Sequence, residues 1–328
     1  MGRRDAGRDH RLERDRRSCG DVVVNGIDLS FAHAAVVMPK EYTKLRIIQV
    51  GAGGTGSFAA LAIARLMFEL KESGKAAELL IVDPDRIESG NIPRGNFCAA
   101  EIGSFKAQTL AKRIALAWGL ECHYANEPFD AETHLKQSAS DYRSLTVIVG
   151  CVDNHLARRE MHRAVEQFQG YQSNDAPNTW WVDGGNGKYS GQVLIGSTTK
   201  RLKPEKHFVG SSICRSLPAP SLVHPELLTD QEKERRPLTP VSCPERIRLG
   251  EQSLNVNQRV AVEIAEMLTS MFLARNLKRF ATYFDLESGT SRSLYCMPEN
   301  IETALGGRQK QRKTAKCNEV IRSEGKRF

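Results

Sequence analysis

Four glycines that directly follow an apolar segment have the spacing of a phosphate-binding turn. Gly51, Gly53 and Gly56 fit the pattern G-x-G-x-x-G after the apolar residues 45–50, with Gly54 inside the turn, and helical apolar spacing follows them. Such glycines allow a tight turn and let the backbone approach an anion at the positive end of a helix. The pattern predicts a nucleotide site but does not specify the nucleotide.

An acidic residue ends the next apolar segment. Asp83 stands 27 residues beyond Gly56, directly after the apolar residues 79–82, and Asp85 follows it in the same turn. An acid at this place commonly accepts hydrogen bonds from ribose hydroxyls. Taken alone, this arrangement favours a nicotinamide-dependent dehydrogenase.

Charged and amide side chains further along the chain suit a triphosphate better than a nicotinamide. Asn91 and Arg94 lie in a loop rich in Gly, Pro and Asn, Lys106 opens the next helix, and Asp153 follows the apolar residues 145–150. Cations neutralise phosphate charge, and a carboxylate at the end of a strand can hold Mg²⁺. The plainer alternatives are a loop ion pair for Arg94, a solvated side chain for Lys106 and a helix N-cap for Asp153.

Together these segments resemble the adenylation domain of the superfamily of ThiF, MoeB and the ubiquitin-activating enzymes. The resemblance rests on VGAGGTGS, VDPDRIESGNIPRGNF, GSFKA and GCVDNHLARR, and it covers about residues 43–196. Proteins of this superfamily bind ATP with Mg²⁺ and attack its α-phosphate with the C-terminal carboxylate of a ubiquitin-like protein. The products are an acyl-adenylate and pyrophosphate. The resemblance therefore implies ATP and Mg²⁺ as cofactors, a small ubiquitin-like protein as partner, and a homodimer in which an arginine of the partner's N-terminal region can complete the site.

The resemblance also implies a role for each matching residue. The turn glycines would surround the nucleotide, and Asp83 would bind the ribose, with Asp85 beside it. Asn91 and Arg94 would face the phosphates. Lys106 would stabilise charge that develops on the triphosphate, and Asp153 would hold Mg²⁺.

Three features depart from the superfamily pattern. Gly95 stands where the superfamily has glutamine, no CxxC pair is present among the eight cysteines, and no cysteine occupies the usual thioester position. We therefore expect no structural zinc. Adenylation itself needs positioning and charge rather than a protein nucleophile. The best remaining candidate for a thioester nucleophile is Cys243, and Cys214 is second. Either thiol would need nearby positive charge to lower its pKa.

The segment SCPERIRLGEQSLNVNQRVA narrows the resemblance. With GGTGSF and IPRGNF, it is similar to the ThiF-family proteins of the bacterial PRTRC cassette, which is carried on plasmids and integrative elements together with a ubiquitin-like protein. Two alternatives remain open: activation of a carboxylate carried by tRNA, and a non-catalytic nucleotide-binding scaffold. The retained Arg94, Lys106 and Asp153 argue against the scaffold.

The composition is that of a globular protein with basic ends. Of 328 residues, 40% are hydrophobic and 26% are charged, and the net charge is +8. Residues 1–20 carry +3 and residues 307–328 carry +6, which leaves the body near −1. These ends predict only weak attraction to nucleic acid. No apolar run approaches the ~20 residues that cross a bilayer, so we expect a cytoplasmic protein without membrane attachment.

Strands that alternate with helices predict a Rossmann-like, doubly wound, mostly parallel α/β sheet with helices on both faces. We expect a disordered basic arm over residues 1–20, a ThiF-like adenylation domain over 21–304 and a basic tail over 305–328. The domain's expected parts are a core over 43–196, an irregular insertion over 198–250, and a helix with a closing hairpin over 251–298.

Overall fold

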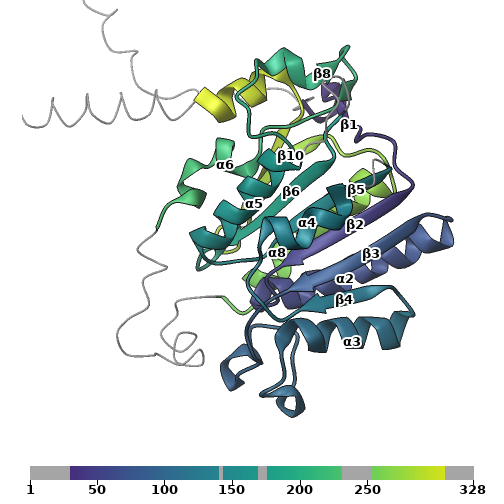
Figure 1. Ribbon diagram of the computed structural model, residues 1–328. Helices are drawn as coiled ribbons and strands as arrows, with labels where there is room; N and C mark the ends of the chain where they lie inside the picture. The colour runs from purple at the N-terminus through teal and green to yellow at the C-terminus, as the bar shows by residue number, and fades with distance from the viewer. Residues whose placement is uncertain (1–29, 140–142, 169–175, 231–252, 307–328) are drawn as a thin grey trace, which may run out of the picture.

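The computed structural model describes residues 30–139, 143–168, 176–230 and 253–306. An eight-stranded sheet crosses the molecule, and helices cover both of its faces (Figure 1). The expected arm over residues 1–20 and nearly all of the expected tail lie outside the described residues. Within the described part, the fold confirms the predicted Rossmann-like α/β class.

The sheet has the strand order β11-β10-β7-β6-β5-β2-β3-β4. The parallel strands are β2 (Lys44–Val50), β3 (Ala76–Val82), β4 (Cys122–Ala125), β5 (Ser144–Gly150) and β6 (Thr179–Asn186). The antiparallel strands are β7 (Ser190–Gly196), β10 (Arg279–Asp285) and β11 (Thr290–Tyr295). Every residue of β5 is buried, as expected for an apolar strand at the centre of a sheet that is covered on both faces.

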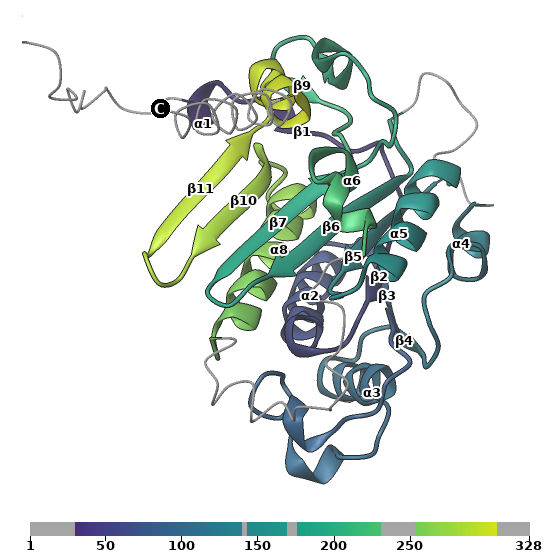
Figure 2. The same cartoon turned by 90° about the vertical axis from the view of Figure 1, so that its left-hand side faces the viewer.

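One face of the sheet packs against α2 (Gly54–Glu72), α3 (Lys106–Trp118) and α8 (Val256–Phe272), and the other packs against α4 (Ala131–Ala139), α5 (His155–Gln167) and α6 (Pro220–Val223). Each face has its own hydrophobic cluster. The adjacent residues Trp180 and Trp181 enter opposite clusters, and both are fully buried. This alternation follows from the two-residue period of a strand. Figure 2 shows α8 lying behind β6 and β7.

Short elements complete the described chain. The strands β1 (Val36–Val37), β8 (Phe208–Val209) and β9 (Ile213–Cys214) form a second, small sheet. The remaining short helices are α1 (Ser30–His33), η1 (Ser89–Asn91), η2 (Ala99–Glu101), η3 (Pro204–His207) and η4 (Pro225–Leu228), and residues 298–306 are also helical. The expected irregular insertion therefore contains several short elements up to residue 230.

Two long helices on the same face of the sheet have simple ends. Helix α3 begins after Phe105, without a side-chain cap. Helix α8 ends at Phe272. In the described part of the chain, no helix combines the length and apolarity that crossing a membrane requires.

Candidate active site

The site is built where three parallel strands end together. Val50 at the end of β2 is in register with Val82 of β3 and with Gly150 of β5. The amide of Gly51 donates to the Val82 carbonyl (2.9 Å), and the amide of Cys151 donates to the Val50 carbonyl (2.8 Å). The glycine turn, Asp83 and residues 151–154 therefore lie at one sheet edge. The chain also changes direction across the sheet between β2 and β5, and ligands of open α/β sheets bind at such switch points.

The glycine turn packs tightly against the sheet at Gly51 and Gly56, whereas the space next to Gly53 is open. Gly51 has φ +94°, and a Cβ there would lie 2.5 Å from the Cys151 carbonyl oxygen. A Cβ on Gly56 would lie 2.1 Å from the Gly51 oxygen. The buried Gln49 Nε2 donates to the carbonyl oxygens of both glycines, at 2.9 Å each. By contrast, a Cβ on Gly53 would have no atom within 4 Å.

Helix α2 starts directly from this open side. Its N-cap is Gly53, which provides no side-chain hydrogen bond. The first backbone N–H groups of a helix have no partner inside the helix, and together with the helix dipole they favour a bound anion. The turn therefore fits a phosphate group that approaches on the side of Gly53.

Asp83 fastens the turn to β3. Its Oδ2 accepts from the Ala52 amide (2.6 Å), and its Oδ1 accepts from the Asp85 amide (2.8 Å). Burial raises the pKa of this carboxyl, while the Ala52 amide and the nearby Lys106 ammonium oppose that shift. Each carboxylate oxygen can accept more than one hydrogen bond, so the expected contact with a ribose remains compatible with this bracing role.

Lys106 brings a positive charge to the same edge. It is the first residue of α3, its amide donates to the Asp85 carbonyl (3.0 Å), and its Nζ lies 2.9 Å from Asp85 Oδ2. The lysine side chain is only 10% exposed, whereas that of Asp85 is 61% exposed. The plainer alternative of a solvated lysine is therefore wrong.

The loop that carries Asn91 and Arg94 packs against α2. Asn91 Oδ1 accepts from the Glu88 amide (2.8 Å) and so stabilises the loop locally. A Cβ on Gly95 would lie 3.0 Å from Ser57 Oγ, which accepts from the Asn96 amide at 2.8 Å. Glycine in place of the superfamily's glutamine thus suits the close approach of this loop to α2. Arg94, which precedes it, is half-buried.

Asp153 is left exposed by its neighbours. Asn154, not Asp153, caps α5, because Asn154 Oδ1 accepts from the Ala157 amide (2.9 Å). The side chain of Asp153 is exposed and makes no hydrogen bond or ion pair with the described residues. A free carboxylate at this edge offers the oxygen ligands that Mg²⁺ prefers.

A buried ion pair fixes the turn that bears Asp153. Arg158 Nε lies 3.1 Å from Asp183 Oδ1, and Arg158 Nη2 donates to the Val152 carbonyl (2.7 Å). Asp183 is fully buried. Burial raises the pKa of Asp183, and the arginine partly offsets the shift.

The sequence matches the ThiF family over residues 29–206, which is more than half of the chain. The chain belongs to the ThiF family. A search of curated proteins finds no match.

Solved structures similar to this ThiF-family protein include selenomethionine PaaA, with 13% identity and a TM-score of 0.49 over 76% of this chain and 64% of that one. The E. coli protein MccB with AMPCPP and selenomethionine MccA has 13% identity and a TM-score of 0.46 over 76% and 63% of the two chains. MccB with MccA-N7isoASN has the same identity and TM-score over 76% and 64%. The ThiF-family protein thus spans just under two thirds of each of these chains.

Three amide side chains at the candidate site of this ThiF-family protein were not predicted from the sequence. Gln49 supports the glycine turn from within β2. Asn186 and Asn257 meet Thr55 at the start of α2. A polar residue inside an otherwise apolar strand is the signal that points to Gln49, but nothing in the spacing links Asn257 to a turn 202 positions away.

Of the two thiol candidates in this ThiF-family protein, the structure describes only Cys214. Cys243 lies outside the described residues. Cys214 is fully buried, and its Sγ donates to the Ser216 carbonyl (3.1 Å). Burial raises the pKa of Cys151. The structure therefore places Cys214, the second thiol candidate, as a buried packing residue.

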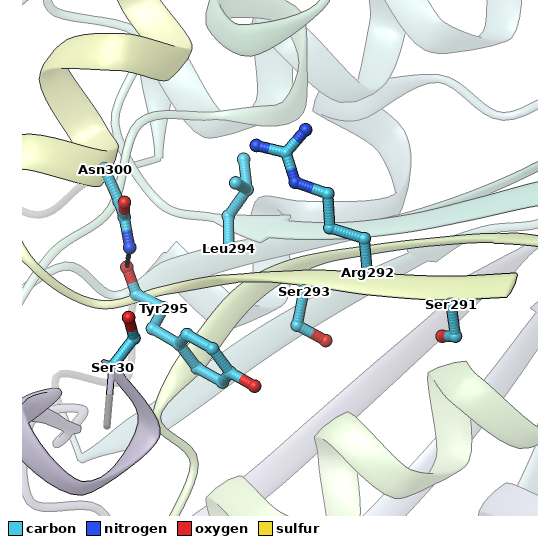
Figure 3. A pocket seen from close by; sticks show the side chains of 7 residues that line it. All are labelled: Ser30, Ser291, Arg292, Ser293, Leu294, Tyr295 and Asn300. Carbon is cyan, nitrogen blue, oxygen red and sulfur yellow. Dashed lines mark hydrogen bonds between the residues drawn. The ribbon is translucent and has the colours of Figure 1, made fainter. Parts of the chain in front are cut away.

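A cavity of about 320 Å³ lies apart from the strand ends just described, beside the edge strand β11 (Figure 3). Its lining residues come from α1, β11 and the helical residues 298–306, namely Ser30, Ser291, Arg292, Ser293, Leu294, Tyr295 and Asn300. Four strands separate β11 from β2 in the sheet. This cavity therefore contributes nothing to the candidate nucleotide site.

Proposed function

We propose that this ThiF-family protein uses ATP and Mg²⁺ to adenylate the C-terminal carboxylate of a small ubiquitin-like protein, with release of pyrophosphate. The observation that carries the proposal is the convergence, at one sheet edge, of an uncapped helix N-terminus, a nearly buried lysine and an exposed carboxylate. A dehydrogenase has no need of this set of charges.

The residues at this sheet edge suit both the phosphates of ATP and the Mg²⁺ ion that the reaction requires. The open side of Gly53 leaves room for a phosphate group next to the first amides of α2. The exposed Asp153 would hold Mg²⁺, which would neutralise part of the triphosphate charge. Lys106 and Arg94 would supply further positive charge to the phosphates.

The adenylation reaction requires no protein nucleophile. A carboxylate oxygen of the substrate attacks the α-phosphorus of ATP, and the bond from that phosphorus to the bridging oxygen of the β-phosphate breaks. Pyrophosphate leaves with the electron pair of that bond. The contributions expected from Lys106, Arg94 and the turn amides are orientation and stabilisation of developing negative charge.

The choice of a ubiquitin-like partner rests on the similarity of the segment SCPERIRLGEQSLNVNQRVA to PRTRC-cassette proteins. The resemblance to the wider superfamily makes a homodimer part of the proposal, and analytical ultracentrifugation would test it. Cys243 is the thiol that we would examine for a later thioester.

The decisive experiment is ATP–pyrophosphate exchange with Mg²⁺, with and without the ubiquitin-like protein of a PRTRC cassette. Asp153→Ala is the test variant, and Glu166→Ala, at an exposed position on α5, is its matched control. We expect exchange that needs the partner and is lost in Asp153→Ala alone. ATP binding without exchange would instead favour a nucleotide-binding scaffold, and exchange that needs tRNA would favour a tRNA-borne carboxylate.

A further inference from the structure

The side chain of Asn257 joins three parts of the site that are far apart in sequence. Its Oδ1 accepts from Thr55 Oγ1 (3.2 Å) at the start of α2 and also bonds Asn186 Nδ2 at the end of β6. Its Nδ2 donates to the backbone carbonyl of Arg94 (3.2 Å). The side chain is almost completely buried, at 3% exposed. One amide thus connects the glycine turn, β6 and the loop expected to face the phosphates.

Gly54 makes this approach sterically feasible. A Cβ on Gly54 would lie 2.4 Å from Asn257 Nδ2 and 3.2 Å from the Arg94 carbonyl oxygen. The superfamily resemblance implies that Gly54 is one of the glycines that surround the nucleotide. In the structure, its bare backbone accommodates the Asn257 amide and the Arg94 loop, which is a second reason for glycine here.

The hydrogen-bonding pattern requires an amide. Asn257 accepts two hydrogen bonds with Oδ1 and donates one with Nδ2, whereas an ionised aspartate can only accept. Aspartate has the same shape but no N–H to offer the Arg94 carbonyl. A buried polar group that loses its partner is costly, so the three contacts hold each other in place.

We propose that Asn257 is a positioning residue that holds the backbone at Arg94, and thereby directs the arginine side chain toward the phosphates of bound ATP. This inference rests on the proposed nucleotide site but not on adenylation itself. Helix α8, which carries Asn257 in its first turn, packs along α2. Through Asn257, the Arg94 loop is therefore positioned relative to α2, the helix whose N-terminus would contact the phosphates.

A double-mutant cycle on ATP binding separates positioning from a general structural role. Isothermal titration calorimetry with Mg²⁺ and a non-hydrolysable ATP analogue would be applied to four proteins: wild type, Asn257→Asp, Arg94→Ala and the double variant. Asn257→Ser repeats the cycle without added charge and serves if the aspartate variant does not fold. Gln258→Ala, an exposed neighbour on α8, is the matched control.

We expect Asn257→Asp to weaken nucleotide binding about tenfold in the wild-type background but less than about twofold when Arg94 is already alanine. Equal weakening in both backgrounds, or an Arg94→Ala variant that binds as tightly as wild type, overturns the proposal. A wild-type protein that binds the analogue but catalyses no pyrophosphate exchange refutes adenylation, while the cycle still tests the role of Asn257. No binding by the wild type refutes both.

Discussion

The ammonium of Lys106 lies 2.9 Å from the carboxylate of Asp85, and the lysine is nearly buried while the aspartate is largely exposed. The exposed partner can turn into solvent and leave the lysine free to meet a more strongly charged phosphate. We expect this ion pair to hold Lys106 in place before the proposed nucleotide binds.

Replacing Lys106 by methionine should abolish most adenylation while the protein stays folded. The loss of one preorganised cation typically lowers turnover by about 100-fold or more. The ion pair itself contributes little to stability, because Asp85 is exposed and screened. Pyrophosphate exchange and thermal unfolding measure the two effects. Lys112→Met, at an exposed position on the same helix, is the control, and turnover equal to wild type in Lys106→Met would remove the lysine from the site.

Alanine substitutions at two glycines of the turn separate a structural role, at Gly51, from a binding role, at Gly53. Gly51→Ala should destabilise the protein by about 2 kcal/mol or more, since it combines a positive φ with a clash against the Cys151 carbonyl. Gly53→Ala meets no neighbouring atom, so its effect on stability should stay below about 1 kcal/mol. Its methyl group would instead occupy the open side of the turn and weaken ATP binding. Urea unfolding and calorimetry are the measurements, and unchanged ATP affinity in Gly53→Ala would contradict a phosphate at this turn.

The buried pair of Arg158 and Asp183 makes a prediction about stability. Arg158→Met should cost about 3 kcal/mol or more, because it leaves the Asp183 carboxylate buried without its counter-charge. Replacing both residues by apolar ones of similar size should cost less than Arg158→Met alone. Urea unfolding compares these variants with Arg159→Met, whose parent arginine is exposed on the same helix. A double variant that is less stable than the single one would refute the argument.

The sequence predicted the sheet well because its signals are local. An apolar run predicts the strand at residues 145–150, and a glycine turn predicts the start of α2. The register of β2, β3 and β5 then brings Asp83 and Asp153 to one edge of the sheet. The short strand β4 carries no such signal, because it is only half-buried or exposed along its length and gives no periodic pattern.

The rest of the site depends on contacts between distant segments. The bond from Thr55 to Asn257 forms only once α8 has packed on α2, and no motif of either segment predicts it. The same holds for Asp153, whose exposure depends on Asn154 taking the cap of α5. Local propensity permits either residue as the cap, since both side chains suit that position.

His207 makes the stability of the fold depend on pH. Its ring is fully buried at the end of η3, with Nδ1 3.0 Å from Ser216 Oγ. Burial lowers the pKa of His207 below its ordinary value, so the folded state favours the neutral ring. Its contribution to stability is therefore complete above the unfolded-state pKa of about 6.5 and is lost as the pH falls through that value toward the lower folded-state pKa.

We accordingly expect the free energy of unfolding to fall between about pH 7.5 and pH 5.5, and His207→Gln to reduce that fall. The glutamine amide can still bond Ser216, so the variant tests titration rather than loss of the contact. Part of the fall should remain, because burial also lowers the pKa of His162. Urea titrations at both pH values, with the exposed His123→Gln as control, provide the measurement. An equal fall in wild type and His207→Gln would show that the His207 ring does not titrate across this range.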